Sequence, residues 1–489
     1  MLMQTEIERT FPRSSQGHRT SQDALEQVFD VQMHAYEHEP YLPRSARVDC
    51  LNRLLAMIEE HESEIIEAID TDYHGRSSHE TRLAELFVVR SGILHARRYL
   101  KSWMRERRVP TGWAFLPGRN RLIRQPLGVV GVVSPWNYPL QLALCPTLAA
   151  LAAGNRVMIK PSELTPRFSE LLERLISETF AVTEVAVING GPEVGEAFTR
   201  LPFHHLLFTG STGVGRKVAV AAAGNLTPVT LELGGKSPVI IDSSADLALA
   251  ASRIAYGKWM NAGQTCVAPD YLLVPQGQSS TIAEHLTKAV RGMFPTVLHN
   301  PDYTAIINDS HLARLRGMIE EAREKGSVIV EIKSGEEVFD KSSNKLPPTL
   351  VLSPGLKTRL MTEEIFGPVL PIIEYNTVND AIHFVNERER PLALYWFGKD
   401  KAIRDRVLKE TISGGVTVND CLWHLAQEEQ PFGGVGASGM GAYHGEWGFR
   451  TFSKEKPVFH QSFFTGNWLL YPPYGRVFEA LYKVLRKIV

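Results

Sequence analysis

The sequence contains little cysteine and almost no net charge, and it lacks the histidine spacings that mark metal sites. Its four cysteines form no C-x-x-C pair, which argues against a disulfide scaffold or zinc ribbon and suits the reducing cytoplasm. The formal net charge of −1 gives no reason to expect nucleic acid or an anionic membrane as a partner. Without clustered histidines we also expect no metal ion.

Long apolar runs are missing as well. The longest candidate for a transmembrane segment, residues 142–153, is too short and is interrupted by Pro146. Residues 1–23 are polar and lack the apolar core of a signal peptide. With 489 residues, of which 44% are apolar, the chain is expected to be soluble and cytoplasmic and to form two or three domains.

Strands that alternate with helices predict an α/β fold with two sheets. Short apolar runs, typical of strands buried on both faces, lie at 127–133, 156–160, 184–188, 205–209, 238–241, 271–274 and 328–332. Helices of similar length between them indicate parallel sheets covered on both faces. Helical periodicity also predicts helices at 44–70 and 80–103, a turn-rich excursion at 104–126 and an amphipathic tail helix within 468–489.

Cys266 is the first candidate for chemistry, because it lies among small and polar residues just after a predicted helix. A thiol on such a loop can be exposed and can act as a nucleophile. A buried structural cysteine is the commoner role of a lone cysteine, and we assign that role to Cys50, Cys145 and Cys421.

Two further side chains have unusual surroundings. Glu232 lies in an otherwise apolar strand, where burial would raise the pKa of the carboxyl and suit it to act as a general base; an ion pair with Lys236 is the alternative. Asn137 follows the strand at 127–133, where ligands bind in open α/β sheets. Its amide can donate to an oxyanion, although a simple turn explains the asparagine equally well.

Three other segments have the chemistry of a nucleotide site. The glycine-rich stretch 208–215 follows a strand and opens a helix, which lets phosphate approach the helix N-terminus. Lys160 and Glu163 follow another strand and can bind ribose or phosphate. A carboxylate in 363–368 can hold a second ribose. Each segment has a simpler alternative: a plain turn for 208–215, surface charges for Lys160 and Glu163, and a helix cap for 363–368.

Together and in this order, these six segments resemble the aldehyde dehydrogenase superfamily, over residues 45–460. Glu232 and Cys266 are 34 positions apart, which is the usual interval in that family. Residues 431–445 and 449–453 are similar to its class 3-type branch. Within that branch, residues 263–271 and 300–304 look most like the coniferyl aldehyde dehydrogenases of bacteria.

The resemblance implies a role for each matching residue. Cys266 is the implied nucleophile, Glu232 the general base and Asn137 the oxyanion donor. NAD, with NADP as a possibility, would be held by Trp136, Lys160, Glu163, Phe208, Gly210, Ser211, Val214, Leu233, Glu364 and Phe366. Tyr138 and Phe432 would line the substrate funnel.

The resemblance also implies the division of the chain. The expected parts are an NAD(P)-binding domain of Rossmann-like fold (1–103 and 127–235, with part of 415–444), a catalytic domain (236–414), an oligomerisation element (104–126 and 445–465) and a tail helix (466–489). The oligomerisation element suggests a homodimer.

The expected reaction is the NAD(P)-dependent oxidation of an aldehyde to a carboxylic acid, through a thiohemiacetal and a thioester on Cys266. The expected substrate is an aromatic aldehyde of the hydroxycinnamaldehyde type, with medium- or long-chain alkanals as the alternative. Glu163 should repel a 2′-phosphate and so favours NAD. Three other functions stay open: transfer of the acyl group to coenzyme A, which Glu232 disfavours, a cofactor-free thioesterase, and a catalytically inactive relative.

Overall fold

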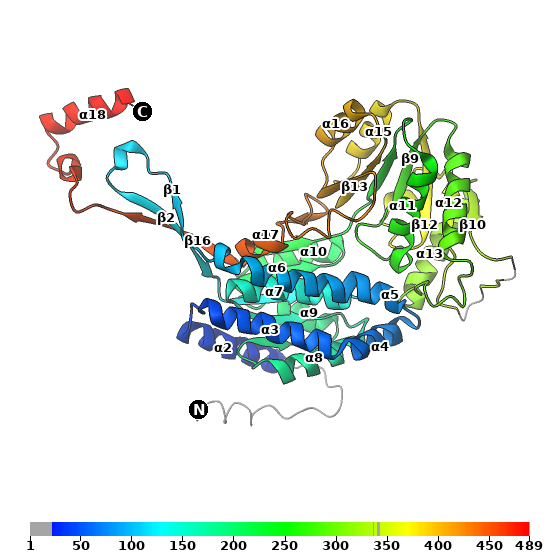
Figure 1. Ribbon diagram of the computed structural model, residues 1–489, viewed down its shortest axis with the longest axis horizontal. Helices are drawn as coiled ribbons and strands as arrows, with labels where there is room; N and C mark the ends of the chain where they lie inside the picture. Colours follow the sequence, from blue (N-terminus) through cyan, green and yellow to red (C-terminus); the bar gives the residue numbers. More distant parts are fainter. Residues whose placement is uncertain (1–21, 336, 340–342, 489) are drawn as a thin grey trace.

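A computed structural model of the chain describes residues 22–335, 337–339 and 343–488. Figure 1 shows two lobes that lie against each other and an arm that projects away from both. The polar N-terminal segment 1–23, for which no signal peptide is expected, lies mostly outside the described residues. Among the helices that the structure describes, none is both long enough and apolar enough to cross a bilayer.

The first lobe is built around a six-stranded sheet. Its strands, in spatial order, are β15 (Gly439–Met440), β7 (Val229–Glu232), β6 (His205–Thr209), β3 (Val129–Val133), β4 (Arg156–Lys160) and β5 (Val185–Val187). All are parallel except β15, which runs antiparallel to β7. Because the carboxyl ends of the parallel strands meet at one edge, the segments that follow β3, β6 and β7 come together there.

Helices cover both faces of this sheet (Figure 1). One face carries α3 (Arg44–Glu60), α6 (Phe87–Trp103), α7 (Pro139–Ala153) and α8 (Pro166–Thr179). The other carries α2 (Gln22–His38), α9 (Pro192–Thr199) and α10 (Thr212–Ala223). Every residue of α7 is buried, which explains why its sequence lacks a polar stripe.

The second lobe contains a seven-stranded sheet. Its strands, in spatial order, are β10 (Val328–Glu331), β11 (Thr349–Leu352), β12 (Val369–Tyr375), β9 (Tyr271–Pro275), β8 (Pro238–Ile241), β13 (Ala393–Phe397) and β14 (Gly415–Val418). Only β10 is antiparallel to its neighbour. Val239 and Ile241 face one core and Ile240 the other, as expected of a strand buried on both faces.

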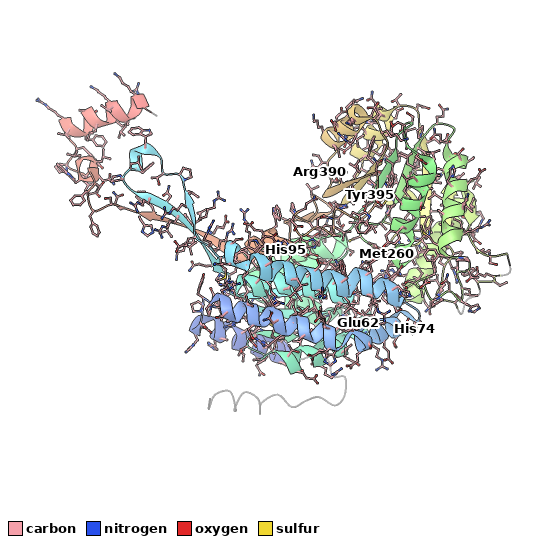
Figure 2. The ribbon with its side chains drawn as sticks, viewed as in Figure 1. Glu62, His74, His95, Met260, Arg390 and Tyr395 are labelled. Carbon is pink, nitrogen blue, oxygen red and sulfur yellow. The ribbon has the colours of Figure 1, made fainter. Side chains whose placement is uncertain are left out.

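The helices of the second lobe also lie on both faces of its sheet. They are α11 (Leu247–Trp259), α12 (Ser279–Met293) and α13 (Asp309–Glu324) on one face, and α15 (Val378–Asn386) and α16 (Lys401–Glu410) on the other. Figure 2 shows Met260, which follows α11, at the lower end of this lobe beside the first lobe. The predicted α/β fold with two helix-covered sheets is confirmed.

The arm is a three-stranded antiparallel sheet of β1 (Arg107–Val109), β2 (Arg119–Pro126) and β16 (Ser453–His460). Helix α17 (Gly445–Thr451) connects it to the first lobe, and α18 (Arg476–Ile488) lies at its far end (Figure 1). The predicted excursion and the predicted tail helix are therefore both found.

Two predicted helices differ from the observed ones. The helix expected at 44–70 is broken at His61, which leaves α3 and a separate α4 (Glu62–Tyr73). The helix expected at 80–103 begins with α5 (Ser78–Thr81) and a π-helical turn, η1 (Arg82–Leu86), before α6. A hydrophobic period of 3.6 residues continues across such a break and cannot reveal it.

Strands near the end of the chain belong to different lobes. Within residues 415–444, β14 pairs in the second sheet and β15 in the first. Along the chain, β7 is the last parallel strand of the six-stranded sheet. The first strand of the seven-stranded sheet, β8, comes after Gly235. The functional division of the chain into domains stays a prediction.

Candidate active site

Cys266 lies on the loop between α11 and β9, and an unusual backbone turn places it there. Asn261, Ala262 and Gly263 are consecutive residues with positive φ angles of 52°, 50° and 75°. A Cβ atom on Gly263 would collide with the carbonyl oxygen of Gly367, so this position requires glycine. The loop leaves Cys266 partly exposed, whereas the other three cysteines are buried, as predicted.

Gln264 fixes this loop with a buried side chain. Its Nε2 donates to the carbonyl oxygens of Asn261 (3.0 Å) and Ala305 (2.9 Å), and its Oε1 accepts from the backbone N–H of Ile307 (3.0 Å). Because all these groups are buried, each hydrogen bond replaces a bond to water that the group loses on folding. The nucleophile candidate is therefore held by a rigid loop.

A cavity of about 310 Å³ opens beside Cys266 at the carboxyl ends of β3, β6 and β7. Nine of the predicted site residues line it: Trp136, Asn137, Gly210, Ser211, Glu232, Leu233, Cys266, Glu364 and Phe366. A larger hollow of about 940 Å³ adjoins it and shares Ser211, Gly234 and Glu364. These residues come from both sheets, so the cavity lies where the lobes meet.

The other predicted residues lie outside the lining of this cavity. Lys160 is buried at the end of β4, where its Nζ donates to the carbonyl oxygen of Pro161 (2.7 Å) and lies 3.8 Å from Glu163 Oε2. The ring of Phe208 is buried beneath Gly210, and Val214 is exposed on the first turn of α10.

The two predicted substrate residues are both buried, Tyr138 beside the nucleophile loop and Phe432 against His444. The Tyr138 hydroxyl lies 2.7 Å from Thr265 Oγ1, one residue before Cys266. Phe432 stacks on His444, with ring centroids 5.2 Å apart.

Glu232 is a buried carboxylate, and neither of its oxygens has a hydrogen-bond partner among the described residues. Its possible ion pair with Lys236 is not formed, because Lys236 binds Asp270 and the carbonyl oxygens of Leu360 and Glu363 instead. Burial raises the pKa of Glu232 well above its usual range. A carboxylate of this kind has the basicity that a general base needs near neutral pH.

The thiol of Cys266 shares this apolar environment. Burial raises its pKa to about 12, and the nearby carboxylates of Glu364 and Glu232 add to the shift. The backbone N–H groups of Cys266 and Val267 act in the opposite direction. In the ligand-free protein the sulfur is therefore a thiol at neutral pH.

The Asn137 side chain points at the same loop, because its Nδ2 donates to the carbonyl oxygen of Gln264 (3.2 Å). Its own carbonyl oxygen accepts from the Tyr73 hydroxyl (3.1 Å), Arg76 Nη1 (2.8 Å) and Asn261 Nδ2 (2.9 Å). Three bonds to one carbonyl fix the backbone of Asn137 beside Cys266. The amide keeps a second N–H that can donate to a ligand.

The surroundings of the cavity fit a dinucleotide. Ser211 caps α10 by accepting from the N–H of Val214 (3.4 Å), and a Cβ atom on Gly213 would meet nothing within 4 Å. An open helix N-terminus of this kind binds phosphate through its N–H groups and dipole. Lys160 and Glu163, at the end of β4, supply a donor and an acceptor for ribose hydroxyls. Among the described residues, no group of three or more potential ligands is placed to hold a metal ion.

Among the lining residues that the sequence did not predict are two ionisable side chains from α13, His311 and Arg314. Arg314 donates to the carbonyl oxygens of Glu364 (3.2 Å) and Ile365 (2.6 Å) and so holds the segment that carries Phe366. His311 packs against Trp136 at 5.1 Å, and its buried Nδ1 has no hydrogen-bond partner in the described part of the chain. Their spacing of three residues on an ordinary helix gave no signal in the sequence.

Comparison with known proteins agrees with this geometry. Residues 14–458 match the aldehyde dehydrogenase family. A Pseudomonas aeruginosa protein named "Probable coniferyl aldehyde dehydrogenase" is 50% identical over 94% of this chain and 95% of its own length. The coniferyl aldehyde dehydrogenase of Pseudomonas sp. strain HR199 is 45% identical over 90% and 91%. The substrate-bound structure of Staphylococcus aureus AldH superimposes with a TM-score of 0.89 at 39% identity, over 94% of this chain and 99% of that one.

The raised pKa of Cys266 leads to a testable pH dependence. We expect alkylation of Cys266 by iodoacetamide to accelerate about tenfold per pH unit from about pH 7 to about pH 10, because only the thiolate reacts. An ordinary thiol would level off near its pKa of about 8.5. Peptide mass spectrometry over a time course measures the rate, and the Cys266→Ala variant identifies the modified peptide. A plateau below about pH 9 would contradict the expected ionisation.

Proposed function

The chain belongs to the aldehyde dehydrogenase family and oxidises an aldehyde to a carboxylic acid with NAD or NADP; within that activity, we propose that its substrate is an aromatic aldehyde of the hydroxycinnamaldehyde type and that Cys266 is the nucleophile. One observation carries the assignment of roles. The Cys266 thiol, the unpaired Glu232 carboxylate and the Asn137 amide line a single cavity at the junction of the two lobes.

The first step is attack of the Cys266 sulfur on the aldehyde carbon, which forms a thiohemiacetal. Attack requires the thiolate, so the thiol first gives up its proton to water, and the backbone N–H groups of Cys266 and Val267 stabilise the charge that this leaves on sulfur. The second N–H of Asn137 Nδ2 and the backbone N–H of Cys266 donate to the oxyanion that develops on the former carbonyl oxygen. Because Asn137 is held by three bonds to its carbonyl, this donor needs little reorganisation during the reaction.

Bound NAD supplies the hydride acceptor that turns the thiohemiacetal into a thioester. Glu232 then removes a proton from a water molecule, and the resulting hydroxide attacks the thioester carbon. The carbon–sulfur bond breaks, the carboxylic acid leaves, and the departing sulfur takes the proton back from Glu232, which restores both the Cys266 thiol and the free carboxylate. The raised pKa of Glu232 suits this proton transfer, since a carboxylate with an ordinary pKa is a weak base at neutral pH.

The residues that would hold the cofactor follow the edge of the first sheet. The N-terminus of α10, with Gly210 and Ser211, would bind the diphosphate, and Lys160 and Glu163 the adenosine ribose. Glu364 and Phe366, held in place by Arg314, would meet the nicotinamide end. The carboxylate of Glu163 favours NAD, because it would repel the 2′-phosphate of NADP.

Two observations support an aromatic substrate. The similar proteins of both Pseudomonas species are named for coniferyl aldehyde. The residues that the sequence assigns to the substrate side, Tyr138 and Phe432, are aromatic and buried next to the nucleophile loop or to other rings. Aromatic side chains pack favourably against a planar ring.

We also propose that the enzyme is a cytoplasmic homodimer. The hairpin of the arm exposes Trp113, Phe115 and Leu116, and β16 exposes Phe459. An apolar patch of this kind on a projecting element marks a protein interface, and residues 104–126 and 445–465 supply it. The unpaired cysteines suit a reducing compartment.

The homodimer can be tested with one charged substitution. Phe115→Glu should shift the protein from dimer to monomer, because it buries an unpaired charge in the interface. Sedimentation velocity measures the change. Val328→Glu, at an equally exposed valine of β10 in the second lobe, is the matched control and should leave the dimer intact. A Phe115→Glu protein that remains dimeric would show that the arm is not the interface.

The substrate proposal is tested by comparing turnover of coniferaldehyde and decanal, with NAD and with NADP. We expect kcat/KM to be highest for coniferaldehyde with NAD, and activity to be lost in Cys266→Ala. A strong preference for decanal would refute the aromatic substrate. Activity that survives in Cys266→Ala would refute the covalent mechanism and reopen the possibility of an unrelated nucleophile.

Replacing the general base should separate the two halves of the reaction. In Glu232→Gln we expect steady-state turnover to fall by about 100-fold or more, since general-base catalysis contributes about 10²–10⁴. A rapid burst of NADH close to one per active site should remain, because the thioester still forms. Intact-protein mass spectrometry should detect the acyl group on Cys266. Loss of turnover with neither burst nor adduct would place Glu232 before the thioester instead.

A further inference from the structure

Three neighbouring side chains near Phe432 bury polar atoms that the mechanism does not use. These atoms are the hydroxyl of Tyr443, both ring nitrogens of His444 and Nε2 of His424, and none has a hydrogen-bond partner among the described residues. Tyr443 is 1% exposed and His444 5%. A buried polar group needs a hydrogen-bond partner, so these four atoms have the free donors and acceptors that a bound polar group could use.

The backbone of His444 gives a second, independent sign of a binding site. Its φ and ψ angles are 95° and 139°, a conformation that residues other than glycine rarely adopt. Backbone hydrogen bonds on both sides of His444 hold it in this conformation. On one side Tyr443 pairs with Phe432 through two backbone hydrogen bonds of 2.8 and 2.9 Å, and on the other Gly448 N–H donates to the His444 carbonyl oxygen (3.1 Å) at the start of α17.

This strained geometry places the imidazole among aromatic rings. The His444 ring stacks on Phe432 with an interplanar angle of 20°, and the Tyr443 ring meets it edge-on at 4.5 Å. Backbone strain that the surroundings maintain is concentrated at functional sites. The fold thus fixes an unpaired imidazole beside the aromatic residue assigned to the substrate side.

The cluster also adjoins the reacting groups. Tyr443 lies near enough to Glu232 and Cys266 that their charges help burial to raise its pKa. The ring of His424 faces Tyr395 at 6.0 Å, and the Tyr395 hydroxyl donates to the carbonyl oxygen of Val267 (2.5 Å), the residue after the nucleophile. Figure 2 shows Tyr395, a residue of β13, in the second lobe, so His424 contacts a side chain of that lobe that is bonded to the nucleophile loop.

The charge state of the cluster selects the kind of ligand. Burial lowers the pKa of both His444 and His424 to about 4, so both imidazoles are neutral at neutral pH. A neutral imidazole has one N–H donor and one acceptor, and a tyrosine hydroxyl has both functions. Such a site suits a neutral hydroxyl on an aromatic ring. An alkyl chain would leave every one of these atoms unpaired.

We propose that Tyr443, His444 and His424 bind the phenolic hydroxyl of a hydroxylated aromatic aldehyde and so select it over the unsubstituted aldehyde. The inference rests on the proposed function, since it assumes that the acyl group on Cys266 carries an aromatic ring. In a hydroxycinnamaldehyde the hydroxyl lies at the end of the molecule opposite to the aldehyde. Binding at that end makes the hydroxyl, and not only the ring, a determinant of specificity.

The experiment compares coniferaldehyde with cinnamaldehyde, which lacks the ring substituents, in the wild-type enzyme and two variants. Tyr443→Phe removes a single hydroxyl at constant shape, and His444→Asn keeps a side chain that tolerates positive φ. Wild-type kcat/KM should be at least about tenfold higher for coniferaldehyde, because a site with buried polar groups rejects an analogue that leaves them unpaired. Each variant should lower kcat/KM for coniferaldehyde about tenfold and change it much less for cinnamaldehyde. His383→Asn, at an exposed histidine of α15, is the matched control.

Thermal unfolding of the free proteins adds a second readout. Because the Tyr443 hydroxyl makes no hydrogen bond to any described residue, Tyr443→Phe should not lower the Tm. Equal kcat/KM for the two aromatic aldehydes in the wild type, or equal losses for both in the variants, would overturn the proposal while leaving the aromatic substrate intact. A wild-type preference for decanal over both would overturn the proposed substrate and this inference together. If His444→Asn fails to fold, Tyr443→Phe decides alone.

Discussion

The backbone carbonyl of Asn137 is the point at which the active site is assembled. It accepts hydrogen bonds from Tyr73 and Arg76, which are neighbours at the end of α4, and from Asn261, which lies almost 190 positions further along the chain. Arg76 is fully buried and pairs with Glu85 at 3.1 Å, and Glu85 in turn accepts from the first backbone N–H groups of α7. Burial of such a pair is costly unless its geometry is complete. Here the network positions Asn137, the proposed oxyanion donor, together with the start of α7 and, through Asn261, the loop of Cys266.

The reacting groups themselves have few polar contacts. In the part of the chain that the structure describes, the Glu232 carboxylate has no hydrogen-bond partner, and burial raises the pKa of the Cys266 thiol. The contrast with Asn137 agrees with the roles proposed for these residues. A donor must be rigid so that little reorganisation accompanies the reaction, whereas a general base must keep its lone pairs free for a proton. The surrounding network therefore fixes the backbone of the site and leaves its reactive atoms unpaired.

Much of this could be predicted from the sequence, for physical reasons. The strands at 156–160, 205–209 and 238–241 have the predicted bounds, because buried parallel strands are continuous apolar runs that end at turn residues. Glu232 and Cys266 stand out because a carboxylate in an apolar strand and a thiol on a polar loop are unusual, but their predicted roles come from the family resemblance and the 34-residue interval between them. The break at His61 and the π-helical turn at 82–86 were missed, since the apolar period continues across them. That turn is not incidental, as it carries Glu85, the partner of Arg76.

The residues that could not be predicted share one property: their role comes from contacts between distant segments. His311 and Arg314 lie on an ordinary amphipathic helix, and only the folded chain brings them to Trp136 and Glu364. The strain of His444 depends on the pairing of Tyr443 with Phe432 on one side and α17 on the other. An unpaired buried atom alone does not mark a site, since Gln32 Oε1 is unpaired deep in the first lobe. The unpaired atoms of Tyr443 and His444 differ because backbone strain, aromatic stacking and proximity to Cys266 coincide there.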